Sequence, residues 1–268
     1  MKLHSMQGAR ETGPSSLSIS PKLAAHLFTL AALAMWFLAS LALPPYLIPG
    51  PTLVARTLWG MVSDQETMAN VYASILHVGL ALIASFIVGT LLAILSREIQ
   101  QLDILIRHRI LPFINSFPGV GWALLALVWF GIGSTSVIFT ITLVLTPLAI
   151  INMRAAIDSV DHELIEMGAS FGRNKLELLR LIVFPSVVPY AFATFRINFG
   201  TAWKITLTAE LFGGGAGLGF LLNIARQGFD MSTIFAIFAV IMSIIYFVDR
   251  LIFAPLQRLL GEPNARES

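Results

Sequence analysis

Two basic side chains stand inside an otherwise uncharged, apolar stretch of this chain. Arg196 and Lys204 lie in the run 186–209, and Gly200 falls midway between them. The spacing of four residues places all three on one face of a helix. An ionisable side chain in such a segment is costly and is a functional candidate, and an arginine holds sulfonate, nitrate or carboxylate oxygens through charge-assisted hydrogen bonds. The pattern predicts a polar path for an anion.

A structural interpretation of the same charges stays open. Lys204 can extend its ammonium group to the headgroup layer while its stem remains in the apolar region. Arg196 can pair with a carboxylate or with carbonyl groups at a helix end. If the helix begins near residue 186, Arg196 lies about 15 Å and Lys204 about 27 Å along it, and Glu210 comes close to the far interface.

Other kinds of chemistry find little support. The chain has no cysteine, and no Ser/His/Asp set or pair of carboxylates suggests catalysis. The run 162–166 reads His-Glu-x-x-Glu rather than His-Glu-x-x-His, so no metal site is expected. His26 and His77 lie near the ends of apolar stretches and are expected to be structural. The net charge of +2 does not suggest nucleic-acid binding.

The elements that carry these residues are expected to span a membrane. The hydrophobic fraction is 56% and the charged fraction 12%, against roughly 45–50% and 25% in soluble domains. The run 110–153 has no charge, and as one helix it would be about 66 Å long, so it must form two spans that break at 131–136. Six spans are predicted: 23–43, 71–95, two within 110–153, 186–209 and 231–248.

Two of these spans need comment. The first could be a signal peptide, but a long polar arm precedes it and 21 residues favour a membrane span. Prolines and glycines cluster where the third span begins, and they are expected to break it there, which makes this segment a candidate gate. The cluster consists of Pro112, Pro118, Gly119 and Gly121.

Positive charge predicts the orientation. Segments 1–22, 97–109, 154–180 and 250–268 hold 13 of the 17 Lys and Arg residues, whereas the opposite side holds only Arg56 and Arg226. Cytoplasmic loops carry the excess of Lys and Arg. We therefore expect both termini to be cytoplasmic.

The largest polar segment between spans is predicted to form two short helices. Residues 158–166 begin an amphipathic helix, and Gly172 offers its stop. Asn174 and Glu177 have the spacing of a capping box for a second helix. Pro185 is expected to end that helix in the first turn of the fifth span. Pattern alone also fits an ordinary connector resting on the headgroups.

The spacing within this loop resembles the EAA loop of permease subunits of ATP-binding-cassette (ABC) importers. That motif reads Glu-Ala-Ala, three residues, Gly, nine residues, Ile, two residues, Pro. This chain places Glu166, Gly172, Ile182 and Pro185 at the same intervals, with Met167 and Gly168 in place of the two alanines. Gly168 is expected to lower helix stability by about 1 kcal/mol relative to Ala.

The resemblance extends over roughly residues 45–260, to the branch that imports nitrate, sulfonates and taurine. It rests on the following motifs, in order: Trp129-Phe130-Gly131-Ile132-Gly133, Ser159-Val160-Asp161, Phe184-Pro185, Arg196 with Gly200, Ala202 and Trp203, Ala209-Glu210, Gly217-Leu218-Gly219, and Asp249-Arg250. It implies an all-α, polytopic membrane bundle of six transmembrane helices with the type I ABC importer permease (MetI-like) fold. The domains would be a disordered cytoplasmic arm (1–22), a permease domain (23–255) with its coupling loop (154–185), and a cytoplasmic tail (256–268).

The function that the resemblance implies is that of the bacterial inner-membrane permease subunit of an ATP-driven importer, without catalysis of its own. Two ATPase subunits would carry ATP and Mg, because this chain has no P-loop. A second permease chain, expected to be an identical copy, and a periplasmic or lipoprotein solute-binding protein would complete the assembly. Trp203 and Glu210 match the family pattern and would join Arg196, Gly200 and Lys204 along the path, with packing between helices as the alternative role for both.

The expected cargo is a small anion such as an alkylsulfonate, taurine or nitrate, with a neutral heterocycle such as a pyrimidine vitamin precursor as the alternative. An ion-coupled secondary transporter would usually show inverted repeats and acidic residues at midmembrane. A membrane-anchored enzyme or scaffold lacks support because no catalytic set is visible. The glycine run 213–219 is expected to form a tight re-entrant turn or a gate on the noncytoplasmic side.

Overall fold

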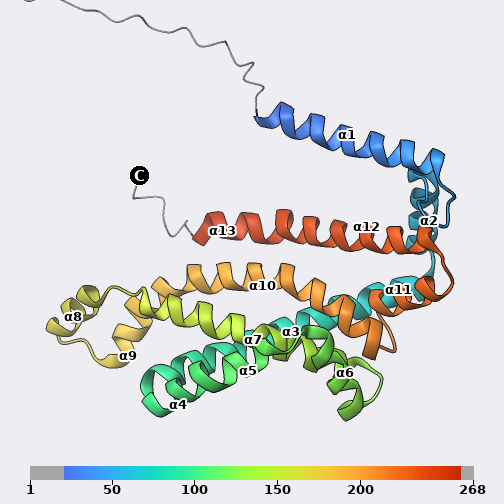
Figure 1. The fold of residues 1–268 in the computed structure, drawn as a ribbon. Helices are drawn as coiled ribbons and strands as arrows, with labels where there is room; N and C mark the ends of the chain where they lie inside the picture. Colours follow the sequence, from blue (N-terminus) through green and yellow to red (C-terminus); the bar gives the residue numbers. More distant parts are fainter. Residues whose placement is uncertain (1–20, 261–268) are drawn as a thin grey trace, which may run out of the picture.

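The computed structural model describes residues 21–260, in which every regular element is a helix (Figure 1). Five helices are long and apolar enough to cross a membrane, and a bent pair forms a sixth candidate span. The predicted all-α membrane bundle is confirmed. Its elements are α1 (Pro21–Ala42), α2 (Pro51–Ser63), α3 (Gln65–Glu98), α4 (Gln100–Leu105), η1 (Ile106–Ile110), α5 (Leu111–Ser116), α6 (Gly119–Phe130), α7 (Ser134–Asp158), α8 (His162–Ser170), α9 (Lys175–Leu178), η2 (Leu179–Val183), α10 (Phe184–Gly213), α11 (Leu218–Gln227), α12 (Met231–Val248), η3 (Asp249–Phe253) and α13 (Ala254–Leu260).

The ends of the chain lie partly outside the described residues. This applies to residues 1–20 of the predicted polar arm and to 261–268 of the predicted tail. The last helix, α13, runs to Leu260, beyond the predicted end of the permease domain at residue 255.

The uncharged run that is too long for one span divides as expected. Helix α6 ends at Gly131 and α7 starts after Gly133, and both glycines have positive φ angles, of 76° and 148°. The third span starts earlier than predicted, at Gln100, and bends by 87° between α5 and α6. The bend falls at Phe117 and Pro118, which are extended, so the predicted break is confirmed.

Helix α10 begins at Phe184 and has Pro185 in its first turn, as predicted, but no break precedes it, because α9, η2 and α10 form one continuous helical stretch from Lys175 to Gly213. Proline has no N–H to donate and normally interrupts a helix. Here the π-helical turn η2 precedes it, and the N–H of Phe184 donates to the carbonyl of Leu179, five residues back. The wider turn lets the chain pass Pro185 without a break.

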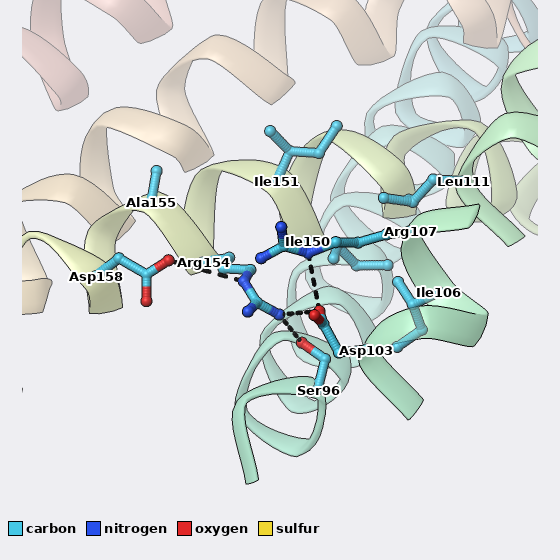
Figure 2. A pocket seen from close by; sticks show the side chains of 10 residues that line it. All are labelled: Ser96, Asp103, Ile106, Arg107, Leu111, Ile150, Ile151, Arg154, Ala155 and Asp158. Atoms are coloured by element: carbon cyan, nitrogen blue, oxygen red, sulfur yellow. Dashed lines mark hydrogen bonds and ion pairs between the residues drawn. The ribbon is translucent and has the colours of Figure 1, made fainter. Parts of the chain in front are cut away.

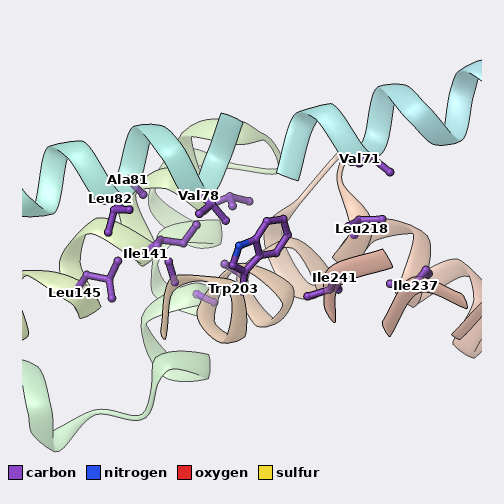
Figure 3. Close-up of a cluster of buried hydrophobic side chains, with 14 of the residues drawn as sticks. Val71, Val78, Ala81, Leu82, Ile141, Leu145, Trp203, Leu218, Ile237 and Ile241 are labelled. Carbon is purple, nitrogen blue, oxygen red and sulfur yellow. The ribbon is translucent and has the colours of Figure 1, made fainter. Parts of the chain in front are cut away.

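Small residues bring the central helices together. A Cβ added to Gly89 of α3 would lie 2.4 Å from the Cβ of Ala149 on α7, so these two helices cross closely. Trp203 of α10 is 2% exposed and lies among Val78, Ile141 and other buried apolar side chains (Figure 3). Helices α3, α7 and α10 thus form the centre of the bundle.

Aspartate side chains cap the first turns of two long helices, α3 and α12. Asp64 accepts hydrogen bonds from the N–H and the hydroxyl of Thr67 at the start of α3, at 2.8 and 2.6 Å. These bonds hold the pKa of the Asp64 carboxyl below its ordinary value. Asp230 caps α12 in the same way through Thr233.

The bundle has two distinct ends (Figure 1). Helices α8 and α9 lie at one end, together with the start of α1, the α3–α4 junction and α13. Helices α2 and α11 lie at the other, called the far end below, together with the turn between α10 and α11. The described segments that carry most of the positive charge therefore share one end, as the orientation argument requires.

Candidate functional site

The predicted helix–turn–helix of the coupling loop is present. Asp161 caps α8 by accepting the N–H of Glu163 at 2.8 Å. Gly172 closes the helix with a φ of 75°, and its N–H donates to the carbonyl of Ala169. Asn174 and Glu177 form the predicted capping box at the start of α9. Both helices thus have defined ends, which gives the loop a fixed shape.

Gly168 has a role that the sequence did not show. A Cβ at this position would lie 2.5 Å from Cδ2 of Leu178 and 3.0 Å from Cδ1 of Ile182. The missing side chain lets α8 pack directly against α9 and η2. The motif residue Ile182 is therefore part of the contact that holds the two helices together.

The outer surface of this loop exposes large apolar side chains among its charged ones. Met167 is 52% exposed, Phe171 77% and Leu176 73%, and Glu166 and Pro185 are exposed as well. Exposed apolar patches on a charged loop are typical of protein–protein contact sites.

An ion-pair cluster supports the base of the loop (Figure 2). Arg154 at the end of α7 pairs with Asp103 of α4 and donates to Ser96 of α3 at 2.8 Å. Arg107 also pairs with Asp103, at 2.9 Å. These side chains and Asp158 line a cavity of about 330 Å³. The cluster ties three helices together where the coupling loop begins.

Arg196 takes the paired arrangement rather than standing free. Its Nε and Nη2 atoms donate to the two carboxylate oxygens of Asp249 at 2.7 and 2.8 Å, and Nη1 donates to Gln257. The charge of Arg196 is therefore balanced, and the contact fastens α10 to η3 and α13. A direct role of Arg196 in the path remains a prediction.

Lys204 differs from Arg196. It is exposed, and it has no ion pair within residues 21–260. Beside it, a Cβ at Gly200 would meet nothing within 4 Å. Thr201 and Thr208 share this face at helical spacing, and their hydroxyls donate to backbone carbonyls of α10. We call this surface, made by Gly200, Thr201, Lys204 and Thr208, the α10 face.

The two other predicted path residues point away from the α10 face. Trp203 is buried in the core and stacks edge-on with Phe199 at 6.3 Å. Glu210 has no exposed surface and is bound by Ser74 and His77 of α3. Both residues pack inside the described chain in this conformation.

The sequence reading did not single out the partners of Glu210. The sequence predicts a structural role for His77 and indicates no role for Asn70 or Ser74. Asn70, Ser74 and His77 are separated by four and three residues, which places three polar side chains on one face of a largely apolar helix. This spacing is the sequence signal that could have indicated a polar contact. Among residues 21–260, no group of three or more His, Cys, Asp or Glu could hold a metal ion.

Comparison with known proteins gives a consistent result. The model of the family described as "Binding-protein-dependent transport system inner membrane component" matches residues 85–261. The riboflavin transport system permease protein of Chloroflexus aurantiacus is 33% identical over 218 residues, 79% of this chain and 80% of that protein. The taurine transport system permease protein of Escherichia coli is 29% identical over 253 residues, 90% of each chain.

A solved structure shares the fold. The inward-facing MetNI methionine ABC transporter matches with a TM-score of 0.62 and 14% sequence identity. The match covers 73% of this chain and 96% of that chain. At this identity the likeness concerns the fold alone.

Proposed function

The chain belongs to the family of binding-protein-dependent transport system inner membrane components, and on that premise we propose that it forms the path of a small organic or inorganic anion. It is a multi-pass permease subunit of an ABC transporter rather than an enzyme, and it has the predicted MetI-like fold. The proposed cargo belongs to the class of alkylsulfonates, taurine and nitrate.

The observation that carries this proposal is the charge of Lys204 on the α10 face, which has no ion-pair partner in the described part of the chain, residues 21–260. A cation inside an apolar span is costly unless it has a partner or a function. Asp249 balances Arg196, so Lys204 is the cation left to attract an anion on α10. The Thr201 and Thr208 hydroxyls use their protons on backbone carbonyls, which leaves their oxygens as acceptors. A zwitterion such as taurine offers a sulfonate to the Lys204 ammonium group and an ammonium group to the threonine oxygens.

We propose further that the coupling loop (154–185) docks on a separate ATPase subunit, present in two copies, which holds ATP and Mg. Its exposed apolar side chains and capped helices support this role. A second copy of this permease and a solute-binding protein complete the proposed assembly. The positive charges at the α8–α9 end support cytoplasmic termini.

The test is uptake into vesicles that hold this permease with its ATPase and its solute-binding protein. Lys204→Gln is expected to lower uptake of the bound anion about tenfold or more, because one charged hydrogen bond is lost. Arg56→Gln, the same loss of charge on exposed α2, is the matched control and retains uptake. Uptake by Lys204→Gln at the parent rate would remove Lys204 from the path.

A neutral heterocycle is the second candidate, and the riboflavin relative favours it. Titration of taurine, ethanesulfonate, nitrate and riboflavin into the binding protein separates the two. If riboflavin alone binds, and Lys204→Gln then transports it normally, the anion proposal fails and the permease function stands.

A further inference from the structure

The turn between α10 and α11 is held by side chains from other helices. Three consecutive backbone N–H groups at the start of α11 each have a side-chain acceptor. Gly217 donates to Oδ1 of Asn70 at 2.8 Å, Leu218 donates to Oγ of Ser74 at 2.7 Å, and Gly219 donates to Oε2 of Glu210 at 2.8 Å. Helix starts leave such groups unpaired, so α3 and α10 together cap α11.

Glu210 is the centre of this arrangement. Its carboxylate has no exposed surface and also accepts from Ser74 at 2.8 Å and from Nδ1 of His77 at 2.8 Å. Nδ1 of His77 and the Ser74 hydroxyl both contact the same carboxylate oxygen, Oε1. The carboxyl group also lies at the N-terminal end of α11, where Gly219 donates to Oε2.

Two glycines leave the space that Glu210 fills. A Cβ at Gly217 would lie 2.3 Å from Cδ of Glu210, and one at Gly219 would lie 2.6 Å from the carbonyl oxygen of Leu207. Gly217 also has a φ of 114°. These glycines serve close packing around a carboxylate, so their presence does not indicate a flexible segment.

The loop between α6 and α7 joins the same unit. Nε2 of His77 lies 2.9 Å from Oγ of Ser134, the first residue of α7. The N–H of Gly133 donates to the carbonyl of Gly213 at 2.9 Å. A Cβ at Gly215 would lie 3.6 Å from Cγ2 of Ile132. Four helices thus meet through one connected set of hydrogen bonds.

We propose that Ser74, His77 and Glu210 are positioning residues that hold α3, α7, α10 and α11 as one rigid unit at the far end of this permease during transport. We call these residues, together with Asn70, the far-end clamp. The glycine run 213–219 is then no hinge, and its distance from the 131–133 loop stays constant while access alternates. This inference rests on the proposed function to one extent: it assumes that the chain changes conformation during transport. It does not depend on which solute is carried.

A disulfide across the unit tests this directly, because the chain has no cysteine. Ile132→Cys with Gly215→Cys is the pair of choice, because a Cβ at Gly215 lies 3.6 Å from the Cγ2 methyl of Ile132, one of the two γ positions that a cysteine sulfur could replace. The clamp predicts that the bond forms on oxidation and that uptake stays at the level of the reduced protein. Failure of the bond to form, or a block of uptake that reduction reverses, would overturn the proposal. Each single cysteine variant, oxidised in parallel, is the control.

A labelling measurement tests the role of Glu210. A cysteine at the fully buried Leu218 is expected to resist a soluble maleimide in the purified complex. Adding Glu210→Gln leaves buried donors without a charged acceptor, so labelling should become about tenfold faster. Glu66→Gln, at an exposed carboxylate of the same end, is the matched control and leaves labelling unchanged. Equal labelling rates with Glu210 and with Gln would refute the role of Glu210.

The two measurements separate this proposal from the proposed cargo. The labelling assay is run without substrate. It therefore tests the far-end clamp even if the parent protein fails to transport the test anion. If Glu210→Gln prevents assembly with the ATPase, the disulfide result decides alone, since those variants retain Glu210.

Discussion

Replacing Gly172 by valine is expected to uncouple ATP hydrolysis from transport, because this residue sets the turn of the coupling loop. Its φ is 75°, a conformation in which an L-residue costs about 1–2 kcal/mol and a β-branched one more. A Cβ at Gly172 would meet nothing within 4 Å in this chain. The penalty is therefore backbone strain, and about 2 kcal/mol lowers the population of the native turn up to about thirtyfold.

Asparagine is the matched control, because it tolerates this conformation and is close to valine in size. The assay compares ATP hydrolysis with solute uptake in vesicles for parent, Gly172→Val and Gly172→Asn. We expect Val to retain hydrolysis and lose uptake, and Asn to retain both. Equal loss in both variants would place the effect in the contact with the ATPase. Full coupling in Gly172→Val would refute the argument from backbone geometry.

Two further predictions follow from named contacts. Arg196→Gln leaves Asp249 without its partner, and because both side chains are partly exposed we expect a loss of about 1 kcal/mol or less, seen as a lower melting temperature in detergent. The double variant with Asp249→Asn should recover part of that loss, and no recovery would contradict a direct coupling. Asp64→Ala should lower the melting temperature at neutral pH by removing the cap of α3. Because the pKa of Asp64 is lowered on folding, its contribution is present above the ordinary value of 3.8 and fades as the pH falls below it, so an equal effect at low pH would contradict this assignment.

The sequence was most informative where a single segment decides the outcome. An uncharged run twice as long as the bilayer core had to break, and the glycines between α6 and α7 fixed the place. Asn174 and Glu177 predicted a capping box because both partners lie within one turn. The composition and these local signals were sufficient to predict the bundle and the shape of the coupling loop.

Contacts between distant segments were beyond that reading. Glu210 binds Ser74 and His77, more than 130 positions away, so its buried location depends on how α3 packs against α10. Arg196 had two open interpretations, and only the placement of Asp249 beside it showed which partner it has. The helix continues through Pro185 because of the π-helical turn η2, and the local sequence gives no clear signal for such a turn.

The unbroken helix from Lys175 to Gly213 has a mechanical consequence. Its 39 residues measure about 58 Å, roughly twice the hydrocarbon thickness, so it is long enough to join the α8–α9 end of the bundle to the far end. One tip carries the coupling loop and the other ends in the carboxylate that clamps α11. A displacement of the loop at the first tip therefore acts on the same helix that holds α11 at the second, and Pro185, Pro189 and the π-helical turn η2 are the places where this helix can bend.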